Sequence, residues 1–161
     1  FTFLISPSYS MSLSGVPYID GGKGNDTIIG THGVDQLRGG DGNDRLVGLG
    51  GADLIIGDAG DDTLEGGEGT DLLDGGDGMD LIYTGGGRDT VRFVADLSSL
   101  DTLGDFALYS DRIDLIAYSL AYAQISFERA GSMVTMQLAN GKRIRLLNWN
   151  RVVSSSQFVF A

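Results

Sequence analysis

An aliphatic residue recurs every nine positions between residues 21 and 92, and the intervening positions are mostly small or polar. This position is the eighth of each nine-residue block, and it is filled by Ile28, Leu37, Leu46, Ile55, Leu64, Leu73, Ile82 and Val91. In a short strand, one side chain points inward and its two neighbours point outward. The pattern therefore predicts eight short β-strands, each with its seventh and ninth residues facing solvent.

Two further columns repeat in the same frame without a gap. The fourth position is glycine in every block, and the sixth is aspartate, namely Asp26, Asp35, Asp44, Asp53, Asp62, Asp71, Asp80 and Asp89. The second position departs from glycine at Thr31, Leu49 and Asp58, and the first departs at Thr84. Six loop residues and three strand residues form one flat side of a coil, so two blocks would make one turn of a parallel roll.

The loop chemistry suits a hard cation. Glycine adopts positive φ without a steric penalty, so these loops are able to turn backbone carbonyls inward. Calcium takes six to eight oxygen ligands from carboxylates and carbonyls alike. The aspartate would supply the charge and the glycine loop the carbonyl oxygens.

The blocks, such as GGKGNDTII and GGDGNDRLV, resemble the GGxGxDxUx nonapeptide of RTX (repeats-in-toxin) proteins, where U is aliphatic. The resemblance implies an all-β fold: a right-handed, calcium-loaded parallel β-roll followed by a small antiparallel β cap. It also implies an ion between loops stacked on one edge, about six ions or more in total. One edge would stack Asp26, Asp44, Asp62 and Asp80, and the other Asp35, Asp53, Asp71 and Asp89. The implied loop glycines are Gly22, Gly24, Gly40, Gly42, Gly51, Gly60, Gly67, Gly69, Gly76 and Gly78.

Charge divides the chain into two halves. Residues 20–96 carry 15 Asp and 2 Glu against 5 Lys or Arg, a net charge of −12, whereas residues 97–161 carry a net charge of +1. An acidic half excludes a nucleic-acid site there, because phosphate contacts need Lys and Arg. The chain has no cysteine, so it forms neither a disulfide nor a thiolate metal site. Repulsion among stacked carboxylates predicts that the repeats stay largely unfolded without calcium.

We divide the chain into a strand and degenerate repeat (1–20), eight repeats (21–92) and a β cap (93–161). The apolar opening FTFLISP is interpreted as a strand, and the block SLSGVPYID as a degenerate repeat. The first residue, Phe1, suggests a piece of a longer polypeptide.

In the cap, alternation over 125–146 and at the C-terminus predicts antiparallel strands, with a hairpin turn at Asn140-Gly141. Residues 101–115 resemble the segment that follows RTX arrays. Two roles are open for Asp101, Asp105, Asp111 and Asp114: turn formation and capping, which we favour, or a further calcium site. By the resemblance, the cap also carries a secretion signal, although Gln157 stands where family members often have an acidic residue.

No catalytic constellation is found in the sequence. His32 is the only histidine, it occupies a variable loop position, and it is expected to be exposed. The nucleophile-elbow, P-loop and zinc-protease motifs are absent. The sequence therefore predicts a module that is not itself an enzyme.

The resemblance implies a calcium-binding module that folds outside the cell and serves the secretion and stability of a larger exported protein. Its partners would be calcium, upstream domains and type I secretion machinery, with no nucleic acid and no membrane span. One alternative is a polysaccharide-binding accessory module, favoured by a basic cluster of Lys142, Arg143 and Arg145. Another is a self-associating structural subunit of a surface layer or filament, favoured by the outward-facing Leu54, Ile56 and Leu72.

Overall fold

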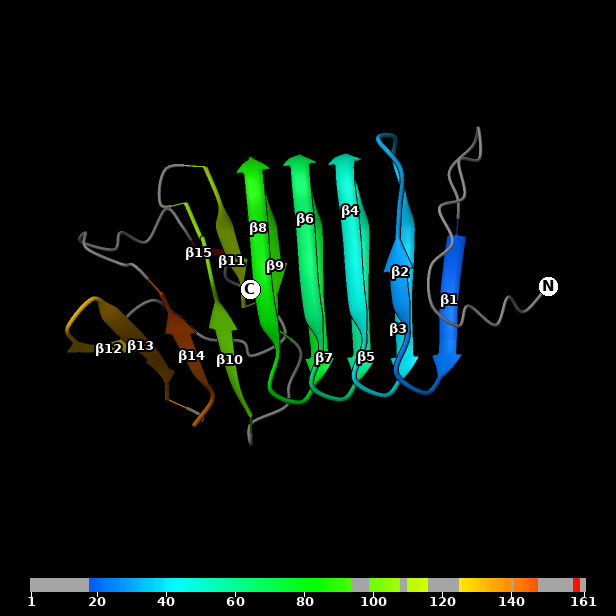
Figure 1. Cartoon of the computed structure of the whole chain (residues 1–161). Coiled ribbons are helices and arrows are strands. Elements are labelled where there is room, and N and C mark those ends of the chain that lie inside the picture. Colours follow the sequence, from blue (N-terminus) through cyan, green and yellow to red (C-terminus); the bar gives the residue numbers. More distant parts are fainter. Residues whose placement is uncertain are drawn as a thin grey trace.

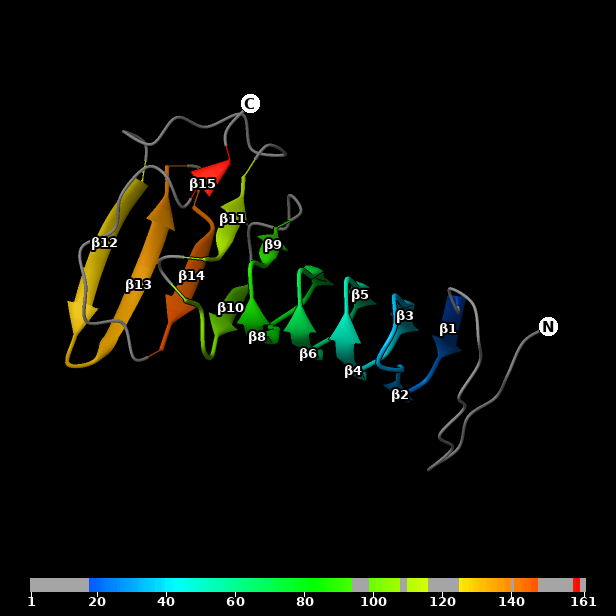
Figure 2. The same ribbon diagram turned by 90° about the horizontal axis from the view of Figure 1, so that it is seen from above.

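The chain folds into two β-sheets that face each other and run continuously from the repeats into the cap (Figures 1 and 2). The computed structural model describes residues 18–93, 99–107, 110–115, 125–139, 141–147 and 158–159. No described residue is helical, so no helix in these ranges is long and apolar enough to cross a membrane. The all-β parallel roll predicted from the nine-residue period is confirmed.

Alternate repeats contribute to opposite sheets. The seven-stranded sheet contains, in order, β1 (Tyr18–Lys23), β3 (Gln36–Asp41), β5 (Leu54–Ala59), β7 (Leu72–Asp77), β9 (Thr90–Arg92), β11 (Arg112–Asp114) and β15 (Phe158–Val159). The eight-stranded sheet contains β12 (Ile125–Ala130), β13 (Met133–Leu138), β14 (Arg143–Leu146), β10 (Leu100–Leu103), β8 (Leu81–Gly87), β6 (Thr63–Gly69), β4 (Arg45–Gly51) and β2 (Thr27–Ile29). Each repeat strand pairs in parallel with the strand two repeats away, as in Leu46 opposite Leu64.

The eighth-position aliphatics form the core between the sheets. All eight are at most 1% exposed, and residues from the cap, including Leu103, Ile113 and Leu146, continue the same two rows. Ile19 of the degenerate block pairs with Leu37 and packs against this core, so its last residues act as a repeat strand. Most seventh- and ninth-position side chains are exposed or half-buried, as predicted; Val47 and Asp74 are buried exceptions.

The cap extends both sheets beyond the repeats. Strands β12, β13 and β14 are antiparallel, as predicted, but β14 pairs in parallel with β10 and so joins the eight-stranded sheet of the roll. Gly141 has a φ of 106°, while Asn140 of the expected turn lies outside the described residues. The expected N-terminal strand, Gln157 and most of the C-terminal strand also lie outside them. The boundary between residues 92 and 93 stays a prediction.

We expect Leu64→Ala to lower the free energy of unfolding by about 2–4 kcal/mol, because it opens a cavity in the middle of a fully buried row. Urea denaturation, under conditions where the wild-type chain is folded, measures this change. Thr63→Ala is the matched control, since Thr63 is the half-buried, outward neighbour on the same strand. Equal losses in the two variants would contradict the assignment of this row as the core.

Candidate metal centre

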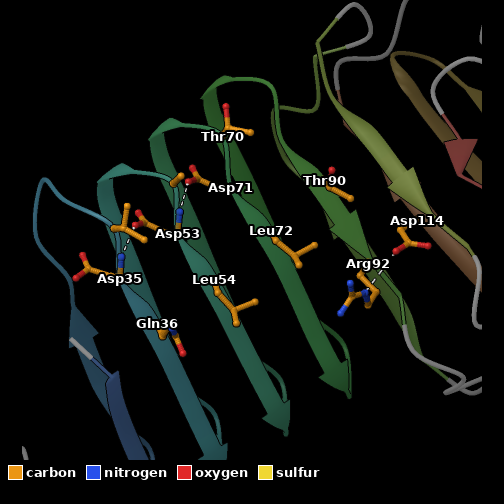
Figure 3. Close-up of a pocket in the computed structure, with 12 residues that line it drawn as sticks. Asp35, Gln36, Asp53, Leu54, Thr70, Asp71, Leu72, Thr90, Arg92 and Asp114 are labelled. Carbon is orange, nitrogen blue, oxygen red and sulfur yellow. Dashed lines mark hydrogen bonds and ion pairs between the residues drawn. The ribbon is translucent and has the colours of Figure 1, made fainter. Parts of the chain in front are cut away.

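The repeat aspartates form two ladders of hydrogen bonds, one along each edge of the roll. In the first ladder (Asp26, Asp44, Asp62, Asp80), each backbone N–H donates to Oδ1 of the aspartate 18 residues later, at 2.7–3.0 Å. In the second ladder (Asp35, Asp53, Asp71, Asp89), the same bonds are 2.9 Å long. Figure 3 shows the bonds from Asp35 to Asp53 and from Asp53 to Asp71. The two edges are those predicted from the sequence, and every ladder carboxylate after the first in each row accepts an amide of the preceding turn through Oδ1.

The second carboxylate oxygen, Oδ2, is buried without a hydrogen-bond partner in seven of the eight ladder aspartates. These are Asp26, Asp44, Asp53, Asp62, Asp71, Asp80 and Asp89. All of them except the half-buried Asp26 are at most 3% exposed. A buried anionic oxygen without a partner is costly, so a native structure that contains seven of them requires a compensating group.

Backbone carbonyls converge on the same places as these oxygens. A Cβ added to Gly21 would lie 2.6 Å from Oδ2 of Asp26 and 2.7 Å from the carbonyl oxygen of Gly39. The first-position glycines Gly30, Gly39, Gly48, Gly57 and Gly66 face the equivalent pair of oxygens. The first position is therefore glycine because a side chain would occupy a space lined by oxygen atoms. An all-oxygen donor set of carboxylates and carbonyls fits a hard cation such as calcium.

The loop conformation depends on left-handed backbone at the second and fourth positions. Each of the ten glycines predicted to lie in ion-binding loops has a positive φ. At Gly40, a Cβ would also collide with the backbone of Gly22 in the preceding turn. Successive loops therefore stack backbone on backbone and leave no room for a side chain at this position. Whether these glycines ligate an ion stays a prediction.

The ligand set differs from a cluster of acidic side chains. In the described ranges, no three Asp, Glu or His side chains converge on one point. Each turn of the roll brings one aspartate to each edge, and the other candidate ligands are main-chain oxygens.

Burial makes most of the ladder carboxylates weaker acids than a free aspartate. Desolvation raises the pKa of Asp53, Asp62 and Asp89 to about 6 and that of Asp80 to about 7, while hydrogen bonds from backbone amides partly oppose this. Carboxylates on adjacent rungs add a smaller upward contribution, as Asp71 does for Asp53. The ionised form of these carboxylates is therefore unfavourable in the folded chain unless a cation binds beside them.

The cap closes the first ladder with the chain's own cation. The Asp80 amide donates to Oδ1 of Asp101, and Oδ2 of Asp101 forms a buried ion pair with Lys142 Nζ at 2.8 Å. Lys142 also donates to Ser99 Oγ and is only 1% exposed. Lys142 is therefore not available to the basic cluster with Arg143 and Arg145 from which the sequence suggested polysaccharide binding. The sequence shows the charge of Lys142 but does not show that a buried carboxylate lies opposite it.

The second ladder ends on Asp111. Its Oδ1 accepts the Asp89 amide, and its Oδ2 accepts the Ala107 amide and the Thr84 hydroxyl. Asp105 accepts the amides of Thr84 and Gly85. These contacts fit the capping role that the sequence favoured for Asp101, Asp105 and Asp111. Asp114 pairs with Arg92 on the outer face.

A second stacking device was missed by the sequence analysis. Oδ1 of Asn25, Asn43 and Asp61 accepts the amides of Asn43, Asp61 and Met79, respectively, in the next loop of the same edge. The signal was visible as a side-chain oxygen at the fifth position of alternate repeats. The other edge has Val34, Ala52, Thr70 and Arg88 there, so this device is specific to the first-ladder edge.

The outer face of the seven-stranded sheet carries the remaining predicted features. Leu54 and Leu72 are half-buried and line a shallow depression of about 480 Å³ beside the second ladder (Figure 3). Ile56 is half-buried in the next row, and His32 is exposed, as predicted.

Comparisons with known proteins agree with this geometry. The pattern of the RTX calcium-binding nonapeptide repeat (four copies) matches residues 18–46, 38–73 and 56–91. The solution structure of the AlgE6R3 subunit of the Azotobacter vinelandii mannuronan C5-epimerase is 29% identical, with a TM-score of 0.56, covering 95% of this chain and 87% of that one. The AlgE6R2 subunit of the same epimerase is 27% identical, covering 83% of this chain and 92% of its own, with a TM-score of 0.45.

No curated protein is similar enough to this chain to count as a relative. The repeat match spans both aspartate ladders, and the AlgE6R3 likeness extends over the roll and the cap together. Residues 18–91 therefore belong to the family of RTX calcium-binding nonapeptide repeats.

Proposed function

We propose that residues 21–92 bind calcium between consecutive rungs of the two aspartate ladders, and that this binding folds the module. The observation that carries the proposal is the set of seven buried Oδ2 atoms without a hydrogen-bond partner. Five of these atoms, those of Asp26, Asp44, Asp53, Asp62 and Asp71, lie close to the carbonyl oxygen of a first-position residue of the next turn. Carboxylate and carbonyl oxygens are the ligands that calcium prefers. Three gaps between the four rungs of each ladder correspond to about six ions.

Calcium suits these gaps better than magnesium does. Magnesium demands near-ideal octahedral geometry and keeps several of its waters, whereas calcium accepts many protein oxygens in irregular arrangements. The stacked loops offer backbone oxygens that the close packing of neighbouring glycine backbones holds in place. We therefore expect selection for calcium.

The wider role we propose is that of a folding and secretion module of a larger exported protein. Without calcium, the chain must bury unbalanced carboxylates to form the roll, so it would remain largely unfolded where calcium is scarce. Extracellular modules typically bind calcium with a dissociation constant of about 10⁻⁴–10⁻³ M. Export in the unfolded state followed by folding outside the cell fits this thermodynamic switch, and type I secretion machinery would be the exporter.

We assign the module no catalytic step. In the described part of the chain, the buried ladder carboxylates bind backbone amides of neighbouring turns, and none is hydrogen-bonded to a serine or histidine. The acids are arranged to hold ions, and chemistry on a substrate would belong to another domain of the parent protein.

Polysaccharide binding is the second candidate. It is supported by the likeness to repeat subunits of a mannuronan epimerase, whose substrate is an acidic polysaccharide. The burial of Lys142 removes one of the three cations first suggested for it, which leaves the exposed Arg143 and the half-buried Arg145. A self-associating structural subunit, based on Leu54, Ile56 and Leu72, stays a prediction.

Far-ultraviolet circular dichroism during a calcium titration tests the main proposal. We expect a cooperative gain of β signal with calcium that a chelator reverses and magnesium does not reproduce.

Asp62→Asn should raise the calcium midpoint by about tenfold or more, because it removes the charge of one rung while keeping the Oδ1 acceptor for the Asp44 amide.

Asp61→Asn is the matched control for Asp62→Asn. It makes the same charge change at the neighbouring residue, yet it keeps the Oδ1 that accepts the Met79 amide, as Asn43 does in the preceding turn. The calcium midpoint of this variant should stay within about twofold of wild type. A full β spectrum in chelator, or equal effects of the two substitutions, would overturn the proposal.

The stability of the metal-free roll should fall as pH rises. Folding raises the pKa of Asp53, Asp62 and Asp89 to about 6 and that of Asp80 to about 7, above the unfolded value of about 4. Protonated carboxyls thus favour the folded chain, so this contribution is fully present below about pH 4 and is lost between about pH 4 and 7. Because protons and calcium compete, the calcium midpoint should rise on acidification. Circular dichroism in metal-free buffer from pH 4 to pH 8 checks the sign; a β signal that grows with pH would contradict it.

Binding of polymannuronate to the calcium-loaded chain tests the second candidate. If the cap holds the polymer, Arg143→Gln should weaken binding at least about threefold, because Arg143 is exposed and able to pair with a carboxylate of the polymer. Arg112→Gln, a second exposed arginine on the other sheet, is the control. Calorimetry that detects no binding by the wild-type chain would eliminate this candidate and leave the calcium proposal unaffected.

A further inference from the structure

Asp35 is the exception in the two ladders. It is fully buried, at 0% exposed, and its amide donates to Oδ1 of Asp53, as the amides of the other rungs do to the next aspartate (Figure 3). Its Oδ2, however, accepts the Thr31 amide at 2.5 Å and the Thr31 hydroxyl at 3.1 Å. The oxygen that faces a gap in the other repeats is therefore already bound by the chain in this one.

The cause lies at the second position of the repeat. Where this position is not glycine, Leu49 and Asp58 still adopt left-handed backbone, with φ of 77° and 78°. Thr31 does not, because a β-branched side chain is strongly disfavoured at positive φ. Gly33, at the fourth position of the same repeat, also lacks the positive φ that the other fourth-position glycines share, and its amide donates to Thr31 Oγ1.

This different loop path changes where the amides point. In the other seven repeats, no second-position amide donates to the aspartate of its own repeat, and the corresponding Oδ2 has no partner. In the second repeat, the Thr31 amide is turned onto Asp35. Two donors then satisfy the charge that a cation would otherwise balance, and they occupy the side of the carboxylate that faces the Gly48 carbonyl of the next rung.

We infer that Thr31 closes the gap between Asp35 and Asp53 with the chain's own hydrogen-bond donors, so that no calcium ion binds there. The inference rests on the proposed calcium function and refines it, leaving about five ions in place of about six. The donors also balance the buried charge of Asp35 without metal, so the second repeat has a smaller need for calcium than the repeats that follow it.

Counting bound ions tests this inference directly. Native mass spectrometry at saturating calcium gives the number of ions per folded chain. We expect Thr31→Gly to bind one ion more than the wild-type chain. Glycine allows positive φ at the second position, so the amide of residue 31 no longer needs to point at Asp35, and the hydroxyl donor is lost as well. Thr31→Val should bind the wild-type number, because valine keeps the β-branching that directs the amide onto Asp35 and removes only the hydroxyl.

Thr70→Gly is the matched control, since Thr70 is an exposed loop threonine on the same edge, and Oδ2 of the adjacent Asp71 has no hydrogen-bond partner. It should bind the wild-type number of ions. An unchanged count in Thr31→Gly, or an added ion in Thr31→Val, would overturn the inference while the calcium proposal stands. A wild-type chain that binds no calcium would overturn both.

Discussion

The structure depends on the burial of one carboxylate per repeat between stacked turns of backbone. Six of the eight ladder aspartates accept an amide of the preceding turn through Oδ1, and seven of the eight keep a buried Oδ2 without a hydrogen-bond partner. In a hydrophobic core this arrangement would be strongly unfavourable, because an unpaired buried anion costs several kcal/mol. The fold therefore places carboxylate and carbonyl oxygens close together, and a cation that binds them stabilises the folded chain.

The narrow aliphatic core follows from the same constraint. Each repeat buries one eighth-position side chain between the sheets, and loops of this length leave no residues for a second layer. Such a core cannot order so many glycines by itself, since glycine loses the most conformational freedom on folding. We propose that metal binding at the edges, together with parallel pairing in the sheets, supplies the rest.

The ends of the ladders show how the chain limits a repetitive structure. At the cap, Lys142 supplies a cation to Asp101, and the Ala107 amide and Thr84 hydroxyl supply donors to Asp111. At the second repeat, Thr31 supplies donors to Asp35. All three aspartates keep the geometry of a rung, but the partners come from the protein. Ordinary hydrogen bonds and one buried ion pair thus mark where the repeated oxygen sites stop.

The sequence by itself determined the period, the inward row of aliphatics and the two stacks of aspartates, because each depends on residues repeated at a fixed local spacing. It also determined the antiparallel strands of the cap from their alternation. Tertiary structure alone decided that Lys142 is buried against Asp101, because these residues are brought together by the parallel pairing of β10 with β14. It likewise decided that Thr31 satisfies Asp35 while Leu49 and Asp58 leave their loops unchanged. A departure from a repeat is visible in the sequence, but its effect depends on the φ that the stacked backbone imposes and on which atoms the neighbouring turn presents.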